Sequence, residues 1–247
     1  MQEFAKINQE ICVVVPTYNN ARFLQETIEN ILQYNENVIV VDDGSTDETN
    51  KIIENFLGKI IWISNKKNKG KGYALHKGFD IAEKLGYKYV ITMDSDGQHD
   101  VADLPLFYKK NAQMPDCMII GSRILRQKNM PVGNTFANKF SNFWFAVQTG
   151  KRLADTQTGF RLYPLKKMHG MRPLLNRYEA ELELLVRSAW RNIKIMPIKI
   201  NVKYPTERIT HFRPFADFLR ISILNTFLCI AAVIYGYPKR LFLWIKR

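Results

Sequence analysis

The chain has few cysteines, and its first residues do not form an apolar run. Only three cysteines occur among its 247 residues, namely Cys12, Cys117 and Cys229, and no pair has the spacing of metal ligands. Cys12 and Cys117 lie in apolar, strand-like runs, where a cysteine is usually a small buried hydrophobic residue. The first ten residues are polar and lack the apolar core of a signal peptide. A disulfide-rich secreted domain is therefore disfavoured, and a reduced, cytosolic compartment is expected.

Acidic residues are outnumbered by basic ones. There are 23 Asp and Glu residues against 36 Lys and Arg residues, which gives a formal net charge of +13. Such an excess favours an anionic partner, such as a phosphorylated substrate, a nucleic acid or a membrane surface. In the first part of the chain the basic residues do not alternate with aromatic residues in a strand pattern, so no nucleic-acid partner is expected.

The chain also lacks internal repeats and low-complexity segments, and its first 125 residues alternate between two patterns. Short apolar, β-branched runs indicate buried strands, and apolar residues at helical spacing indicate helices between them. Strands are expected at residues 11–16, 38–41, 60–63, 89–93, 118–120, 159–163 and 193–200, and helices at 22–34, 47–57, 73–85, 134–149 and 177–190. This order predicts an α/β fold with a mostly parallel, twisted sheet covered by helices on both faces. Ligands bind beyond the carboxyl ends of the strands in such sheets.

Polar clusters follow the expected strands where each one ends. Asp42 and Asp43 are adjacent acids whose repulsion must be offset by donors, and the base N–H and ribose hydroxyls of a nucleoside would serve. Gly44 and Ser45 also fit an ordinary turn and helix cap. The glycine- and lysine-rich run at 68–72 precedes a helix, which suits a phosphate, although P-loop spacing is absent and a flexible basic loop is the alternative.

Asp94 and Asp96 form the most informative cluster. They are two residues apart after an apolar strand, so on an extended chain their side chains point the same way. Together with the amide oxygen of Gln98 they suit a hard divalent cation. Such an ion would bridge to a diphosphate and neutralise a departing nucleotide. An acidic turn without metal is the alternative interpretation.

In their order and spacing, these runs resemble glycosyltransferase family 2, which has the GT-A fold. The motifs are VVPTYN at 14–19, VDDGS at 41–45, NKGKG at 68–72 and the DxD-containing MDSDGQH at 93–99. GSR at 121–123 and DTQTGFR at 155–161 are similar to the dolichyl-phosphate mannose synthase-like branch. The resemblance covers residues 10–200. We therefore divide the chain into a catalytic domain at 1–205, with a nucleotide-sugar part at 10–125 and an acceptor part at 126–205, and a basic, apolar helical tail at 206–247.

The resemblance implies roles for matching residues. The residues expected to contact the nucleotide-sugar are Pro16, Tyr18, Asp43, Lys71, Asp94, Arg123 and Arg161. Those expected to hold Mg²⁺ or Mn²⁺ are Asp96, Asp94 and Gln98. The expected catalytic base is Glu179, with its neighbour Glu181 and the rival Asp155 as the other candidates. A hydroxyl acceptor needs such a base, whereas a phosphate acceptor does not. Glu179 at a helix start is alternatively explained by pairing with the helix dipole.

The resemblance thus implies a metal-dependent, inverting, hexosyltransferase-like enzyme of cell-envelope glycoconjugate biosynthesis. It would move a sugar from a UDP- or GDP-sugar to a lipid-linked or other hydrophobic acceptor. An inactive nucleotide-sugar-binding protein of the same fold is one alternative. A sugar-phosphate nucleotidyltransferase is disfavoured because its Gly-x-Gly-Thr-Arg signature is missing. One departure counts against a polyprenyl-phosphate acceptor without excluding it. Polyprenyl-phosphate transferases usually place an arginine between the GSR and GFR motifs to hold the acceptor phosphate, and here residues 133–142 contain only Lys139.

The tail has a long uncharged stretch. Residues 221–237 carry no charge but include Asn225, Thr226 and Gly236, so the stretch is short and polar for a membrane span. Basic residues interleave with Trp, Phe and Leu after it. This pattern favours a segment on an anionic membrane surface and places the protein in the cytoplasm, peripheral at the inner face of the cell membrane. A helix docked on the catalytic domain is the alternative.

Overall fold

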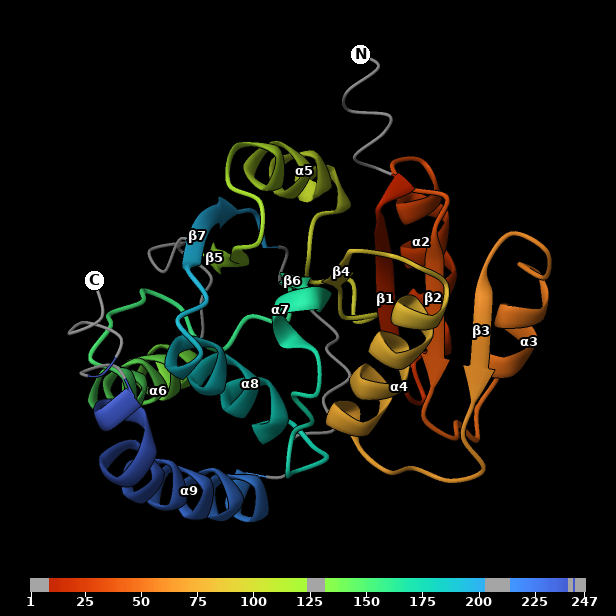
Figure 1. Cartoon of the computed structure of the whole chain (residues 1–247). Helices are drawn as coiled ribbons and strands as arrows, with labels where there is room; N and C mark the ends of the chain where they lie inside the picture. Colours follow the sequence, from red (N-terminus) through yellow and green to blue (C-terminus); the bar gives the residue numbers. More distant parts are fainter. Residues whose placement is uncertain (1–8, 124–131, 203–213, 240–241, 243–247) are drawn as a thin grey trace.

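A computed structural model describes residues 9–123, 132–202, 214–239 and 242, and the expected domain boundary at 205 lies outside these ranges. Its centre is a seven-stranded sheet with the order β3-β2-β1-β4-β6-β5-β7 (Figure 1). The strands are β1 (Ile11–Thr17), β2 (Val38–Asp42), β3 (Ile61–Ser64), β4 (Tyr89–Thr92), β5 (Met118–Arg123), β6 (Arg161–Pro164) and β7 (Ile195–Ile200). Strand β6 runs antiparallel to β4 and β5, and the other neighbouring pairs are parallel. The mostly parallel sheet predicted from the sequence is confirmed.

The helices are α2 (Ala21–Leu32), α3 (Thr49–Glu54), α4 (Lys71–Lys84), α5 (Leu104–Gln113), α6 (Val132–Thr149), α7 (Leu165–Met168), α8 (Glu179–Trp190) and α9 (Pro214–Ala231). A 3₁₀ turn, η1 (Val101–Asp103), precedes α5, and a π-helical turn, η2 (Ala232–Gly236), follows α9. The five helices expected before the tail are present, although the expected helix at 47–57 is shorter. Helix α5 was not predicted, yet its buried Leu104, Tyr108 and Asn111 have helical spacing.

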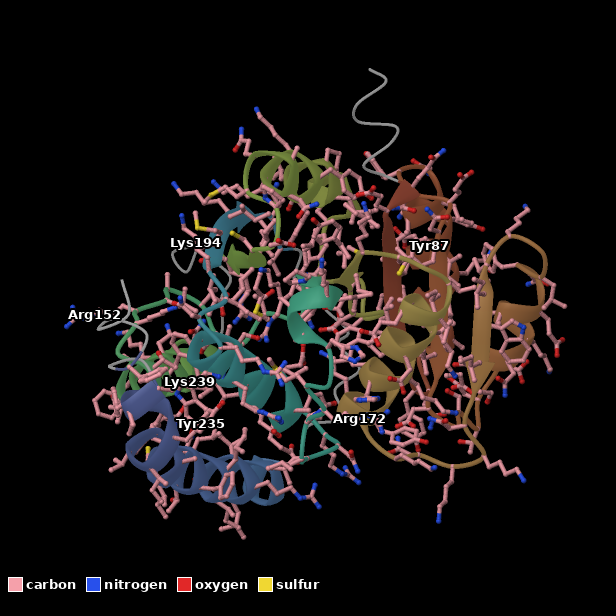
Figure 2. The ribbon with its side chains drawn as sticks, viewed as in Figure 1. Tyr87, Arg152, Arg172, Lys194, Tyr235 and Lys239 are labelled. Carbon is pink, nitrogen blue, oxygen red and sulfur yellow. The ribbon has the colours of Figure 1, made fainter. Side chains whose placement is uncertain are left out.

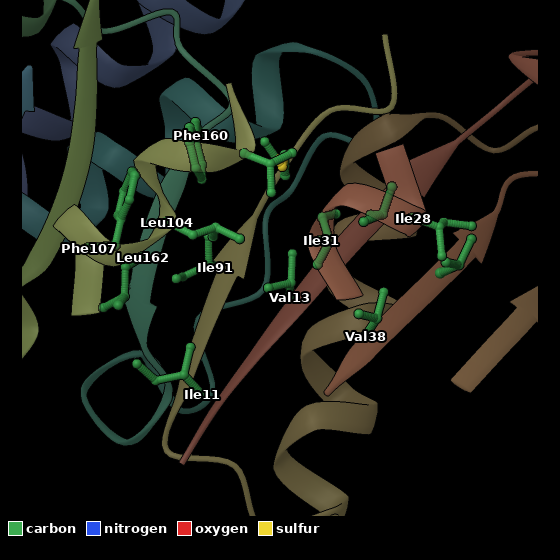
Figure 3. Packing of buried hydrophobic residues seen from close by; sticks show 14 of the residues in the cluster. Ile11, Val13, Ile28, Ile31, Val38, Ile91, Leu104, Phe107, Phe160 and Leu162 are labelled. Carbon is green, nitrogen blue, oxygen red and sulfur yellow. The ribbon is translucent and has the colours of Figure 1, made fainter. Parts of the chain in front are cut away.

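The sheet is buried on both faces, which explains the nearly continuous apolar strands. Ile11, Val13 and Val15 of β1 pack with α2 and α5 on one face, as Figure 3 shows for part of this cluster. Cys12 and Val14 point to the other face, where α4 covers them. Burying one such aliphatic side chain contributes about 1.5–3 kcal/mol. Helices therefore cover both faces, as expected from the sequence.

Helix α9 and η2 pack against α6 and α8. Gly236 leaves room for the indole of Trp190, because a Cβ at this position would lie 2.6 Å from Nε1 of Trp190. Within the described residues, Leu219–Lys239 is long and apolar enough to cross a membrane by length and composition, with a mean hydropathy of 1.7. This helix is longer than the uncharged stretch at 221–237, because it extends beyond that stretch to Arg220 at one end and Lys239 at the other.

Candidate active site

The carboxyl ends of β1, β2 and β4 lie side by side. Thr17 is paired with Asp42 in the β1–β2 ladder, and Val14 with Thr92 in the β1–β4 ladder. The loops after these strands are joined by hydrogen bonds, for example from Asn20 Nδ2 to Ser95 Oγ at 3.0 Å. Three of the motifs found in the sequence therefore meet at one edge of the sheet, as the rule for parallel sheets predicts.

The adjacent acids Asp42 and Asp43 are both buried, and the chain itself supplies donors to each. Ser64 Oγ donates to Asp42 at 2.7 Å. Asp43 accepts from Asn65 Nδ2 at 2.8 Å, from the backbone N–H of Lys69 at 3.0 Å and from that of Gly70 at 2.6 Å. The anion bound at the N-terminus of α4 is thus the Asp43 carboxylate, where the sequence suggested a phosphate.

The glycines of the 68–72 run serve close packing. A Cβ on Gly70 would collide with the backbone oxygen of Asn176, and one on Gly72 with the Cβ of Ala180. The chain before α8 therefore lies directly on the first turn of α4, and Tyr73 N–H donates to Asn176 O at 3.1 Å. This contact brings the acidic start of α8 to the carboxyl edge of the sheet.

Lys71 bridges the two halves of the site. Its ammonium lies 2.6 Å from Asp94 Oδ1 and 2.7 Å from Glu181 Oε2. Burial opposes the charge on Lys71, but the Asp94 and Glu181 carboxylates together outweigh it and raise the pKa of the ammonium. Burial likewise opposes ionisation of Asp94, and Lys71 nevertheless holds the pKa of that carboxyl below its usual range. Lys71 therefore stays charged and both carboxylates have a counter-ion.

Asp155 is bound to Arg123 from two sides. Arg123 Nε lies 2.6 Å from Asp155 Oδ2 and Nη2 lies 3.0 Å from Oδ1. Asn138 Nδ2 and the backbone N–H of Gln157 also donate to Asp155. Burial opposes ionisation of Asp155, but these donors prevail and lower its pKa. A carboxylate so fully occupied is a poor proton acceptor, so the geometry does not support Asp155 as a base. It orients Arg123 instead.

Arg161 does not reach the site as expected. The side chain is fully buried, and its three nitrogens donate to backbone oxygens. Nε donates to Thr158 at 2.7 Å, Nη2 to Thr156 at 2.8 Å, and Nη1 to Glu181 at 2.8 Å. This corrects the expected contact with the nucleotide-sugar, because the guanidinium is used to tie the 155–161 loop to α8.

The chain is similar in sequence to known glycosyltransferases. Residues 12–166 match the model of the family described as Glycosyl transferase family 2. The chain belongs to this family. It is 29% identical over 240 residues to a UDP-N-acetylglucosamine–dolichyl-phosphate N-acetylglucosaminyltransferase of Methanococcus voltae, which covers 87% of this chain and 96% of the relative. It is also 29% identical over 222 residues to the human dolichyl-phosphate beta-glucosyltransferase, which covers 78% of this chain and 67% of that one.

A solved structure shows the same fold. Glucosyl-3-phosphoglycerate synthase from Mycobacterium tuberculosis, crystallised with Mn²⁺, uridine diphosphate and phosphoglyceric acid, aligns with a TM-score of 0.68. The alignment covers 94% of this chain and 81% of that chain at 17% sequence identity. The GT-A fold and the assignment as a family 2 glycosyltransferase, both expected from the sequence, are confirmed.

The metal ligands expected in this family 2 transferase do not lie on an extended chain. The backbone bends after Asp94, and Gly97 has a φ of 70°. Gln98 Nε2 donates to Asp96 Oδ2 at 2.7 Å. Across the described part of the chain no group of three or more His, Cys, Asp or Glu residues could hold a metal. Two carboxylates still fit Mg²⁺ or Mn²⁺, because these ions take their remaining ligands from phosphate and water.

His99 is a residue of the transferase site to which sequence reasoning gave no role. Burial lowers its pKa to about 4, although Asp94 opposes this, so the imidazole is neutral at pH 7. Its Nε2 lies 3.9 Å from Asp94 Oδ2. Its Nδ1 is buried without a hydrogen-bond partner within the described ranges. A neutral ring with an unused nitrogen beside the carboxylates agrees with a site that takes a further ligand. The sequence signal that could have identified His99 as a site residue is its position directly after Gln98, within the motif at 93–99.

Glu179 and Glu181 are both buried at the start of α8 in this transferase. Glu181 Oε2 is paired with Lys71, and in the described part of the molecule neither Glu181 Oε1 nor Glu179 Oε2 has a hydrogen-bond partner. Of the three acids expected as a base, Glu179 and Glu181 therefore each keep an unused carboxylate oxygen, and Glu179 is the one without a salt bridge among the described residues. Pro16 lies buried at the end of β1 and Tyr18 half-buried just beyond it, at the same edge of the sheet.

Proposed function

We propose that this family 2 transferase moves a sugar from a UDP- or GDP-sugar to a lipid-linked phosphate acceptor, with inversion and with Mg²⁺ or Mn²⁺. The observation that carries the proposal is the Lys71 bridge. It joins Asp94, at the edge of the sheet where we place the nucleotide, to Glu181, at the start of α8. A direct displacement requires the sugar donor and the acceptor to lie next to each other, and the place where these two parts of the chain touch would allow this.

The reaction exchanges one bond for another at the anomeric carbon. An acceptor phosphate oxygen forms the new C–O bond from the face opposite the nucleotide. The bond to the nucleoside diphosphate breaks, and its electron pair leaves with the diphosphate. Asp94 and Asp96 would hold the divalent cation, which neutralises negative charge on the diphosphate when bound. Arg123, oriented by Asp155, presents a guanidinium to phosphate oxygens.

Glu179 takes one of two roles, depending on the acceptor. A phosphate oxygen is already ionised at neutral pH and needs no base, so Glu179 would then accept a hydrogen bond from a sugar hydroxyl. A hydroxyl acceptor would instead transfer its proton to the unused Glu179 oxygen. The nucleotide contacts proposed for Pro16, Tyr18 and Lys71 follow from their places at the same edge of the sheet. Asp43 holds the N-terminus of α4 in place beside these residues.

The choice of a lipid-linked acceptor is supported by relatives whose names specify dolichyl phosphate. A hydrophobic acceptor of this kind resides in a membrane, so we place the reaction at a membrane surface. We place it on the cytoplasmic side, where we expect the nucleotide-sugar. The absence of an arginine from residues 133–142 leaves Arg123 as the cation that we assign to phosphate recognition.

The first test is thermal stabilisation of the purified chain by UDP, GDP, CDP and dTDP, each with Mn²⁺ and with chelator. At a hundredfold excess over Kd, a ligand stabilises by about 2.7 kcal/mol, which raises Tm by about 5–10 °C for a chain of this size. We expect the shift for UDP or GDP only, and only with metal. Asp96→Asn should abolish it, whereas Asp116→Asn, at an exposed site, should not.

The second test is transfer of labelled sugar to a short-chain polyprenyl phosphate, measured by extraction into butanol. Binding without transfer to any acceptor would indicate an inactive nucleotide-sugar-binding protein. Transfer to water-soluble acceptors alone would contradict the lipid-linked acceptor but leave the transferase assignment intact. A Tm shift that persists in chelator and in Asp96→Asn would contradict metal dependence.

A further inference from the structure

One side of the C-terminal helix is apolar and exposed. Large hydrophobic side chains recur every three or four residues on the side of α9 and η2 that faces away from the domain. They are Leu219, Ile223, Phe227, Ile230 and Ile234, each exposed over half of its surface or more, with Val233 beside them. We call these six residues the outer face of α9. Exposed apolar groups in a continuous helical stripe indicate a binding surface.

The opposite side of the same helix is fixed to the catalytic domain. Leu224, Leu228 and Ala232 are buried at intervals of one turn. Asn225 Oδ1 accepts from Gln148 Nε2 of α6 at 2.9 Å, and both side chains are buried. The helix is therefore held along its length.

Helix α6 extends the apolar surface. Tyr237 donates a hydrogen bond to the backbone oxygen of Val147, which places the end of η2 against α6. Val147 and Phe143, one turn earlier, are exposed. The surface therefore spans two helices.

Along the two stretches whose side chains form this surface, the charges have one sign. Residues 132–153 contain Lys139, Lys151 and Arg152 and no acidic residue, and Leu219–Lys239 contains two basic residues and no acidic one. Figure 2 shows Arg152, Lys239 and Tyr235 on the same side of the molecule as α6 and α9. Lys239 Nζ lies 2.8 Å from the hydroxyl of Tyr235. Lysine and tyrosine beside an apolar stripe are typical of helices at a membrane surface.

We propose that the outer face of α9, together with Phe143 and Val147, inserts into one leaflet of an anionic membrane, with α9 parallel to the membrane plane. The choice of a lipid surface over a second copy of the chain rests partly on the proposed lipid-linked acceptor. It also rests on charge, because a symmetric pair of copies would bring like-charged basic residues together, whereas an anionic leaflet attracts them.

The contacts of α9 with α6 and α8 argue against a transmembrane orientation of this helix. A spanning orientation would require α9 to leave α6 and α8, which would place Asn225 in hydrocarbon without Gln148 and uncover Trp190. An unsatisfied amide is strongly disfavoured there. An in-plane orientation keeps these contacts and buries only the outer face. In Figure 1, α9 lies on the lower side of the molecule, toward which β3 points, so the membrane would lie on the side of the strands' carboxyl ends.

The proposal is tested by co-flotation of the full chain with vesicles, without nucleotide-sugar, so that its result is independent of transferase activity. We expect binding to vesicles with anionic lipid and weaker binding to zwitterionic ones. Ile223→Asp combined with Ile234→Asp should reduce partitioning at least about tenfold. The matched control is Leu57→Asp combined with Leu85→Asp, two exposed leucines far from α9 in the fold, which should leave binding unchanged.

Orientation is measured with one cysteine added per variant, at Leu219, Phe227 or Ile234, in a Cys229→Ala background that keeps the buried Cys12 and Cys117. Each added cysteine carries a fluorophore quenched by brominated lipids. All three labels should lie at the same shallow depth. A deeper label at Phe227 than at the two ends would overturn the in-plane orientation in favour of a span. Absent vesicle binding, or a dimer in solution that Ile223→Asp and Ile234→Asp dissociate, would overturn the membrane proposal itself.

Discussion

Lys71 and Asp94 form an ion pair of 2.6 Å that joins the first residue of α4 to the loop after β4. The same ammonium reaches Glu181 on α8, so one cation serves two carboxylates from different parts of the chain. The pair sits where the candidate metal ligands meet the acidic start of α8. The arrangement makes Lys71 the structural link between the two sides to which we assign the nucleotide and the acceptor.

Replacing Lys71 should therefore destabilise the fold. Lys71→Met leaves Asp94 and Glu181 as neighbouring, mostly buried acids without a counter-ion, and we expect a loss of about 3 kcal/mol in the free energy of unfolding. Urea denaturation at pH 7 measures it. Lys84→Met, at an exposed position on the same helix, should change stability by less than about 0.5 kcal/mol. Equal stability of the two variants would show that the ion bridge is dispensable.

Gly159 lies against this ion pair. A Cβ at this position would be 2.5 Å from Asp94 Oδ2 and 2.9 Å from Lys71 Nζ. Gly159→Ala should displace the Asp94 carboxylate and abolish the metal-dependent Tm shift with UDP or GDP. The control is Gly86→Ala, where a Cβ meets open space but φ is +85°. That variant should lose about 1 kcal/mol of stability while keeping the Tm shift. Retention of the shift in Gly159→Ala would mean that Asp94 is not needed for binding.

Arg161 should act on stability and not on substrate affinity. Arg161→Met removes three hydrogen bonds that the buried guanidinium donates to the backbone oxygens of Thr156, Thr158 and Glu181. We expect a loss of about 3–5 kcal/mol, measured as the midpoint of urea denaturation. Arg191→Met, at an exposed position, is the control. A variant with normal stability and a raised KM for the nucleotide-sugar would restore the direct contact first expected for Arg161.

Asp155 should contribute a pH-dependent part of the stability. Its folded-state pKa lies below the ordinary value of 3.8, so its stabilisation is complete above about pH 5 and is lost as the pH falls through 3.8 and below. Asp155→Asn should destabilise the protein at pH 7, and the difference from the parent should shrink as the pH falls from 5 to 3. Denaturation midpoints across this range measure it. If the stability difference between Asp155→Asn and the parent did not change with pH, ionisation of Asp155 would not contribute to stability through its pair with Arg123. Asp116→Asn serves as the exposed control.

Much of the fold was predictable because its signals are local. The β-branched runs of β1 and β2 and the helical spacing in α2 and α4 each lie within a few residues of the chain. The order of these elements fixes a parallel sheet, and a parallel sheet brings its carboxyl ends to one edge. The antiparallel insertion of β6 between β4 and β5 could not be predicted, because strand order depends on contacts between distant segments.

The sequence by itself determined the family, the edge of the sheet that carries the site, and the acids gathered there, because motif order and strand periodicity are properties of the chain. Only the tertiary structure decided what each side chain does. In the folded chain Arg161 is buried among backbone oxygens, and Asp155 is paired with Arg123. Asp43 accepts hydrogen bonds at the α4 N-terminus, and one oxygen of Glu179 has no partner among the described residues. The sequence does not distinguish a charged residue that stabilises a loop from one that binds substrate. Which role it has depends on how deeply the side chain is buried and on the hydrogen-bond partners that distant segments supply.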